Sequence, residues 1–209
     1  MDIRFLYRDS EIFVVEKPIG VLSEESDGDE SLANALKAQN GGYIGVVHRL
    51  DRGVGGVMVY ARTKASAARL SAAVQSHALQ KEYLAIVHGK PTEPCGTLTD
   101  LLYHDRTRNK SFVVDRARSG VKEAVLDYKI VKSWESAPLG VASLVKIRLH
   151  TGRTHQIRVQ FSSRGYPLVG DGKYGSREKS DIRLHSHAIT FSHPRTGKLL
   201  TFESLPEWA

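Results

Sequence analysis

The sequence is poor in cysteine, and it contains no long apolar segment. Cys95 is the one cysteine among 209 residues, which excludes an intramolecular disulfide framework and any zinc or iron–sulfur site made from several cysteines. A membrane-spanning helix needs about 20 consecutive apolar residues, and no stretch of the chain approaches that length. The first twenty residues carry seven charged side chains, unlike a signal peptide. We therefore expect a cytoplasmic protein with no membrane contact.

Charge is plentiful and unequally shared between the two signs. The chain has 30 Lys and Arg against 23 Asp and Glu, which gives a net charge of +7. A hydrophobic fraction of 41% is typical of a globular protein and excludes a disordered chain. We predict a single domain over residues 1–209. The positive charge favours a polyanionic partner such as a nucleic acid, with a solvated basic surface as the alternative.

Apolar periodicity predicts more strands than helices. The predicted strands cover residues 3–7, 12–16, 57–61, 81–88, 122–131, 141–150, 184–192 and 198–202. In the strand at 141–150, alternation directs one set of side chains to the core: Val141, Val145, Ile147 and Leu149. Helices should follow N-caps at Ser31, Thr63 and Thr154, the last covering residues 155–163. This pattern predicts an α+β protein with one large mixed, mostly antiparallel central sheet, flanked by helices and loops.

Residues 47–61, VHRLDRGVGGVMVYA, combine a charged block with a glycine-rich turn. Asp51 lies between Arg49 and Arg52 at the mouth of this turn, where loops commonly present functional groups. A turn aspartate paired with a neighbouring arginine is the structural alternative. The glycines have neither the spacing of a dinucleotide fingerprint nor the Gly-Lys-Ser/Thr of a P-loop. The block therefore offers a carboxylate without a phosphate-binding loop.

Residues 151–158, TGRTHQIR, place two arginines and a histidine around a predicted helix start. A helix N-terminus attracts anions, although an ordinary capping segment with surface arginines has the same appearance. The histidines of the chain lack a ligand spacing such as H-E-x-x-H, so no metal site is expected. The Gly-x-Ser-x-Gly elbow is also missing, which argues against a serine hydrolase.

Taken in order, these blocks resemble the RluA-type pseudouridine synthases, which isomerise uridine in RNA. The similarity covers nearly the whole chain and comprises VVEKPIG at 14–20, HRLD at 48–51, KEYLAIVHG at 81–89, TGRTHQIRV at 151–159, GYPLVGD at 165–171 with YG at 174–175, LH at 184–185 and FSHP at 191–194. It implies the pseudouridine synthase fold with an active-site cleft. Many relatives carry a small N-terminal RNA-binding domain, which is not expected here because the catalytic pattern begins within the first twenty residues.

One block departs from the family pattern. Where the family usually has Thr-Ser-Gly after the aspartate turn, this chain has Val54, Gly55 and Gly56. Two hydroxyl groups are lost, and the effect of that loss on local hydrogen bonding or RNA contact is left open.

The resemblance also implies a role for individual residues. Asp51 is the implied catalytic carboxylate, and Arg158 is its implied cationic partner at about 4 Å, an ion-pair distance. Tyr83 would stack on the uracil and bring a hydroxyl near the C5 proton. Further residues are implied to bind the substrate: Leu184, Arg49, Arg52, His48, Lys81 and Arg153. Whether Asp51 attacks C1′, adds to the ring or acts as a base is left open.

The implied reaction gains no atom and involves no redox change, so no cofactor and no metal are expected. The partner would be ribosomal or transfer RNA, and the sequence does not choose the RNA or the uridine. We expect a monomer. Two other functions remain possible at this point. One is a non-catalytic RNA-binding protein that retains the fold, and the other is a metal-dependent hydrolase using the histidines.

Overall fold

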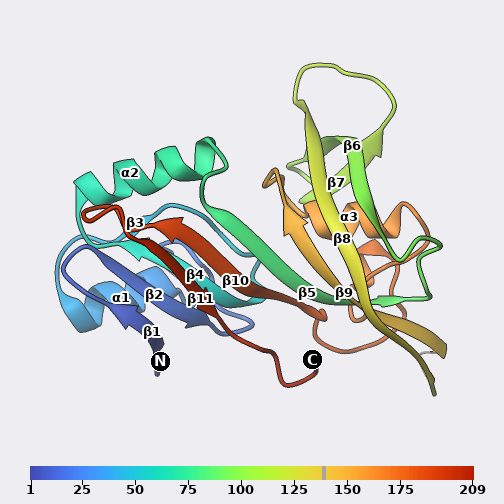
Figure 1. Cartoon of the computed structure of the whole chain (residues 1–209), viewed down its shortest axis with the longest axis horizontal. Coiled ribbons are helices and arrows are strands. Elements are labelled where there is room, and N and C mark those ends of the chain that lie inside the picture. The colour runs from blue at the N-terminus through green and yellow to red at the C-terminus, as the bar shows by residue number, and fades with distance from the viewer. Residues whose placement is uncertain (138–139) are drawn as a thin grey trace. The chain divides into compact units, whose positions relative to one another are not determined.

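The computed structural model describes residues 1–137 and 140–209 (Figure 1). Its internal contacts divide the chain into two compact units. Unit 1 comprises Met1–Glu82 and His185–Glu207, and unit 2 comprises Tyr83–Leu184 and Trp208–Ala209. Each unit has its own strands and helices, and the single domain predicted over residues 1–209 stays a prediction.

Unit 1 is a mixed sheet with two helices. Its strands are β1 (Arg4–Arg8), β2 (Ile12–Lys17), β3 (Gly45–Val46), β4 (Gly55–Ala61), β10 (Leu184–Ser192, from His185 onward) and β11 (Leu199–Glu203). They follow the hydrogen-bonded order β1-β2-β4-β10, with β3 on β4 and β11 on β10. The β1–β2 and β2–β4 pairs are antiparallel, whereas β4 and β10 are parallel.

In unit 1, β4 is covered on both of its faces, so neither face of this strand meets solvent. Every residue of β4 is buried, and β2 is buried along most of its length. The helix α2 (Lys64–Gln75) packs against β4 and adds Leu70 to a cluster with Val57, Val59 and Ile189. The other helix is α1 (Leu32–Asn40).

Two of the three predicted helix caps are confirmed. The Ser31 hydroxyl accepts a hydrogen bond from the Asn34 amide at 3.2 Å, and the Thr63 hydroxyl accepts one from the Ser66 amide at 3.1 Å. These bonds satisfy amide groups that the first helical turn leaves without a partner.

Unit 2 is built on long antiparallel strands. They are the second part of β5 (Gln80–His88, from Tyr83 onward), β6 (Cys95–Asp105), β7 (Lys110–Val114), β8 (Val121–Ser136) and β9 (Gly140–Leu149), in the order β5-β9-β8-β6-β7. The helix α3 (Gln156–Ser162) and the short 3₁₀ helix η1 (Gly172–Tyr174) contribute Val159 and Tyr174 to a core cluster with Leu102 and Ala124.

The fold class is confirmed: the protein is α+β, with mixed, mostly antiparallel strand pairing. All eight predicted strands are present, although β8 continues to Ser136. The hairpin of β6 and β7, visible beside β8 in Figure 1, was not predicted, because its charged turn and short apolar runs give little periodicity. No helix in the described ranges combines the length and the apolar character that a membrane crossing requires.

Two local predictions were wrong. The cap of α3 is His155 rather than Thr154; His155 has a left-handed φ of 55° and makes no side-chain capping bond. Val141 is 43% exposed, whereas Ala142 and Leu144 are buried against Leu84. Residues 142–145 of β9 are all buried, on both faces of the strand, whereas Val141 lies at its exposed start, so the simple alternation read from the sequence does not describe this end of β9.

Candidate active site

Asp51 lies in a tight turn that leads into β4. The Asp51 carbonyl accepts a hydrogen bond from the Val54 amide at 2.9 Å. Gly56, just beyond the turn, has a φ of 118°, and a Cβ atom there would lie 2.3 Å from the Ser186 carbonyl oxygen. Glycine is therefore required at this position for β4 to approach β10.

The two departures from the family pattern fit this packing. Val54 is only 2% exposed, so its side chain belongs to the core rather than to the surface of the turn. A Cβ atom at Gly55 would lie 3.2 Å from the Lys17 carbonyl oxygen, which is a tight contact. Val54 therefore contributes apolar packing, and Gly55 allows a close backbone contact, at the two positions where the family usually has hydroxyl side chains.

Lys17 fastens the Asp51 turn to the segment that follows β2. Lys17 is 1% exposed, and its ammonium group donates hydrogen bonds to the carbonyls of Pro18 at 2.9 Å, Val21 at 2.7 Å and Arg52 at 3.3 Å. The Gly20 amide also donates to the Arg52 carbonyl, at 2.8 Å. This network fixes the backbone immediately after Asp51.

Lys17 also acts on Asp51 through its charge. Burial lowers the pKa of Lys17 to about 8, and the negative charge of Asp51 opposes that shift. The ammonium group of Lys17 and the carboxylate of Asp51 therefore attract each other. Lys17 lies within the VVEKPIG block but received no role from the sequence; the signal that could have identified it is a lysine that directly precedes the Pro-Ile-Gly turn at the end of a strand.

Ser23 supports the other side of the turn. Its hydroxyl donates to the Leu50 carbonyl at 3.0 Å and accepts from the Leu50 amide at 3.1 Å. Leu50 itself is buried. The residues before and after Asp51 are therefore both held by hydrogen bonds from the 17–23 segment.

His48 is buried in unit 1, and the charge of the partly buried Lys81 acts on it. The His48 Nε2 atom accepts a hydrogen bond from the Val59 amide at 3.1 Å, which places the ring proton on Nδ1. Burial, followed by the charge of Lys81, lowers the pKa of His48. Burial also lowers the pKa of Lys81 to about 8. His48 is thus a neutral side chain that supports β4, and substrate contact by either residue stays a prediction.

Arg49 and Arg52 already have carboxylate partners. One Arg49 nitrogen lies 2.9 Å from both Glu24 oxygens, and Arg52 lies 3.1 Å from an Asp29 oxygen. All four side chains are about half exposed. Exposed ion pairs of this kind contribute little stability, so an incoming anion would displace these carboxylates at small cost.

Arg158 is held in unit 2 by a partner that the sequence did not reveal. Its Nε and Nη2 atoms donate to the two Asp171 oxygens at 2.6 and 2.8 Å, and both side chains are buried. The Arg158 guanidinium carbon also lies 5.0 Å from the centre of the Tyr174 ring. Asp171 ends the GYPLVGD block, and an acidic residue closing such a block is the signal that could have identified it.

The other predicted residues of unit 2 are placed as follows. Tyr83 is buried in β5 and Leu184 is buried at the start of β10. Arg153 donates from Nε to the Glu123 carbonyl at 2.8 Å. Asp51 belongs to unit 1, so the expected cleft and the expected ion pair of Asp51 with Arg158 stay predictions. Among the residues that the structure describes, no three His, Cys, Asp or Glu side chains are grouped as a metal site requires.

Comparison with known proteins gives consistent matches. The family model described as RNA pseudouridylate synthase matches residues 11–163. An uncharacterized RNA pseudouridine synthase of Bacillus subtilis is 34% identical over 221 residues, covering 99% of this chain and 70% of the relative. The ribosomal large subunit pseudouridine synthase D of Zymomonas mobilis is 33% identical over 224 residues, covering 97% and 68%.

A solved structure shares the fold. Human RNA pseudouridylate synthase domain containing 1 superimposes with a TM-score of 0.82 at 24% identity, covering 100% of this chain and 85% of that one. The sequence comparisons therefore agree on one family, and the solved structure shows that its fold is shared.

Proposed function

Because the chain belongs to the RNA pseudouridylate synthase family, we propose that it isomerises uridine to pseudouridine in structured ribosomal or transfer RNA, with Asp51 as its catalytic carboxylate. The observation that carries this assignment is the Asp51 turn, which is fixed on both sides and has the buried charge of Lys17 nearby. A non-catalytic RNA-binding protein would have no need of a carboxylate held in this way.

The chemistry explains the choice of residue. The N1–C1′ bond of uridine breaks, the uracil turns while still bound, and a C5–C1′ bond forms. The C5 proton leaves and N1 takes up a proton, so that no atom is gained or lost. Cleavage of a glycosidic bond develops positive charge at C1′, and carboxylates serve there as nucleophile or stabiliser in other enzymes. Asp51 supplies such a carboxylate, and the Lys17 ammonium group places a positive charge near it.

Other residues take supporting roles in the proposal. Tyr83 offers a ring for the uracil to stack on and a hydroxyl for movement of the C5 proton, while Leu184 would pack on the base. Arg158, fixed in orientation by Asp171, supplies a permanent positive charge. A uridine within folded RNA must leave its helical stack to reach such residues.

The relatives suggest where to look for the substrate. Proteins named ribosomal large subunit pseudouridine synthase D match this chain from Zymomonas mobilis and Pseudomonas aeruginosa. Ribosomal RNA is therefore the first substrate to test. Pseudouridine would be mapped in ribosomal and transfer RNA from cells that lack the gene, before and after incubation with the purified protein.

The decisive variant is Asp51→Asn, which keeps the shape of the side chain and removes its charge. We expect pseudouridine formation to fall by a factor on the order of a thousand, the scale of losing a group that stabilises transition-state charge. Asp2→Asn removes an exposed acidic charge from the same unit and serves as the matched control. Turnover by Asp51→Asn at a tenth of the wild-type rate would reject the assignment, provided that both variants fold.

A further inference from the structure

The positive charge of the chain belongs to unit 2. Unit 2 contains 18 Lys and Arg against 10 Asp and Glu, a net charge of 18 − 10 = +8. Unit 1 contains 12 against 13, a net charge of 12 − 13 = −1. An RNA-binding protein attracts phosphates with its basic surface, so most of the phosphate contacts of this protein should be sought in unit 2.

Within unit 2 the charge is concentrated around β7. Residues 106–122 contain six basic side chains and one acidic side chain. The six are Arg106, Arg108, Lys110, Arg116, Arg118 and Lys122. This segment includes the turn between β6 and β7 and the connection from β7 to β8. A basic turn of this kind is suited to following a phosphate backbone.

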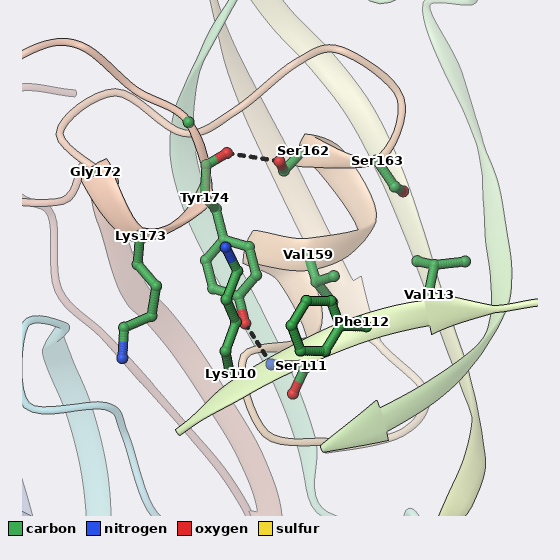
Figure 2. Close-up of a pocket in the computed structure, with 11 residues that line it drawn as sticks. Lys110, Ser111, Phe112, Val113, Val159, Ser162, Ser163, Gly172, Lys173 and Tyr174 are labelled. Carbon is green, nitrogen blue, oxygen red and sulfur yellow. Dashed lines mark hydrogen bonds between the residues drawn. The ribbon is translucent and has the colours of Figure 1, made fainter. Parts of the chain in front are cut away.

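Beside this basic segment lies a pocket with a volume of about 560 Å³. Its walls come from β7, from α3 and from η1 with the glycine that follows (Figure 2). All the residues that line it belong to unit 2. The volume is within the range of small-molecule sites, about 300–1,000 Å³, and is large enough for one nucleotide.

Two lysines provide charge at this pocket. The Lys110 ammonium nitrogen lies 5.2 Å from the Tyr174 ring centre and 5.8 Å from the Phe112 ring centre. Lys173 is exposed, and its ammonium group donates to the Asn109 carbonyl at 3.0 Å. Figure 2 shows both lysines on the side of the pocket formed by β7 and η1.

The aromatic walls differ in how firmly they are held. The Tyr174 hydroxyl accepts a hydrogen bond from the Ser111 amide at 2.7 Å, and its carbonyl accepts one from the Ser162 hydroxyl at 2.6 Å (Figure 2). Tyr174 is therefore fixed. Phe112 is partly exposed and presents a ring without polar atoms. Lysines combined with an accessible aromatic ring form the usual chemistry of single-stranded nucleic acid binding.

We propose that this pocket binds one nucleotide of the RNA substrate other than the target uridine. The base would stack on Phe112, and the adjoining phosphate would lie between Lys110 and Lys173. The inference rests on the proposed function for its ligand class. The pocket also borders the candidate machinery, since Tyr174 contacts Arg158 as well as Lys110.

The test measures RNA binding by the full chain without requiring catalysis. The probe is an oligouridine of twelve nucleotides labelled with fluorescein, and its Kd is measured by fluorescence anisotropy at several salt concentrations. For Lys110→Ala combined with Lys173→Ala, we expect Kd to rise about tenfold. The slope of log affinity against log salt should decrease by about 1.4, because each phosphate contact with a single strand contributes about 0.7.

Phe112→Leu tests stacking separately from charge. It keeps an apolar side chain in place and removes the ring, so Kd should rise by roughly fivefold or more while the salt slope stays unchanged. Lys64→Ala combined with Lys198→Ala removes two exposed lysines from unit 1 and is the matched charge control. Thermal unfolding of every variant shows whether it is folded.

Any of three results would reject the proposal that this pocket binds a nucleotide. These are an unchanged Kd for the double lysine variant, an equal loss of affinity in the control, or an unchanged Kd for Phe112→Leu. The outcome is separable from that of the proposed function. If the protein makes pseudouridine but binds the probe independently of these residues, the proposed function is supported and the proposed nucleotide site is rejected. If it binds the probe through these residues but isomerises no uridine, the nucleotide site is supported and the proposed function is rejected.

Discussion

Lys17 is a buried charged residue whose contacts explain why it is a lysine and not an apolar side chain. A lysine with 1% of its surface exposed carries a desolvation cost, and three carbonyl acceptors and the nearby Asp51 compensate for it in part. A side chain that served only to fill space would be apolar. The Lys17 ammonium group instead holds the Asp51 turn through its hydrogen bonds to backbone carbonyls.

The lowered pKa of Lys17 has a measurable consequence for stability. Below pH 8 the lysine is charged in both the folded and the unfolded chain. As the pH rises from about 8 toward 10.5, the folded chain releases this proton while the unfolded chain retains it, so stability increases with pH. The free energy of unfolding of wild type minus that of Lys17→Met should increase by roughly 2–3 kcal/mol between pH 7 and pH 10.

Urea denaturation at each pH measures this difference. The matched control is Lys64→Met, which removes an exposed lysine from the same unit. An equal increase in the control, or a difference that declines with pH, would contradict the interpretation of Lys17.

Sequence motifs identified Asp51 and Arg158 but not the residues that hold them. Lys17 reaches the turn because it ends β2 opposite Gly56 of β4, a register that only the folded sheet establishes. Asp171 pairs with Arg158 at a separation of 13 positions along the chain. A sequence motif specifies which residues follow one another along the chain. Which side chains meet in the fold depends on strand register and burial, and the motifs do not specify these.

At the scale of elements, the parallel pairing of β4 with β10 depends on one glycine. The expected cost of Gly56→Ala is about 3 kcal/mol or more, because a Cβ atom would strike the Ser186 carbonyl and the residue would be strained at positive φ. Urea denaturation would measure this loss. Gly28→Ala, where an added Cβ meets open space, is the control and should change stability little.

The acidic loop at residues 24–30 should compete with RNA for two arginines. Glu24 and Asp29 pair with Arg49 and Arg52. Replacing them together by Gln and Asn would free both guanidinium groups, so the Kd for RNA should fall severalfold and the salt slope should increase by about 1.4. The binding assay described for the pocket also measures this effect.

A matched control separates this contact from overall charge. Asp27→Asn combined with Glu30→Gln removes the same charge from the same loop, and both residues are exposed. Similar gains in affinity for the two variants would show that net charge, rather than release of the arginines, is responsible.

Elements with strong periodicity were predictable from sequence, and elements set by register were not. Ser31 and Thr63 capped their helices as expected because a hydroxyl before an amphipathic segment is a local signal. Val141 is exposed because it lies at the start of β9, before the stretch 142–145 that is buried on both faces. The point at which the core begins to cover a strand is not visible in the alternation of its residues.

For the whole molecule, the division of charge predicts strong dependence of RNA binding on salt. If the +8 unit contacts at least four phosphates, log affinity should decline with log salt with a slope of about −3 or steeper. Anisotropy titrations of the wild-type chain between low and moderate salt would measure it. A flat dependence would exclude a phosphate-following surface on either unit.

The discontinuity of unit 1 has a consequence for its synthesis. β4, which is buried along its whole length, requires β10 as a partner, and the bond from Ser186 to Val57 joins residues 129 apart. At about 5–20 residues per second, a ribosome makes Val57 many seconds before Ser186. During that interval the emerging chain carries an uncovered apolar strand, which makes it a client for holding chaperones until its last segment is released.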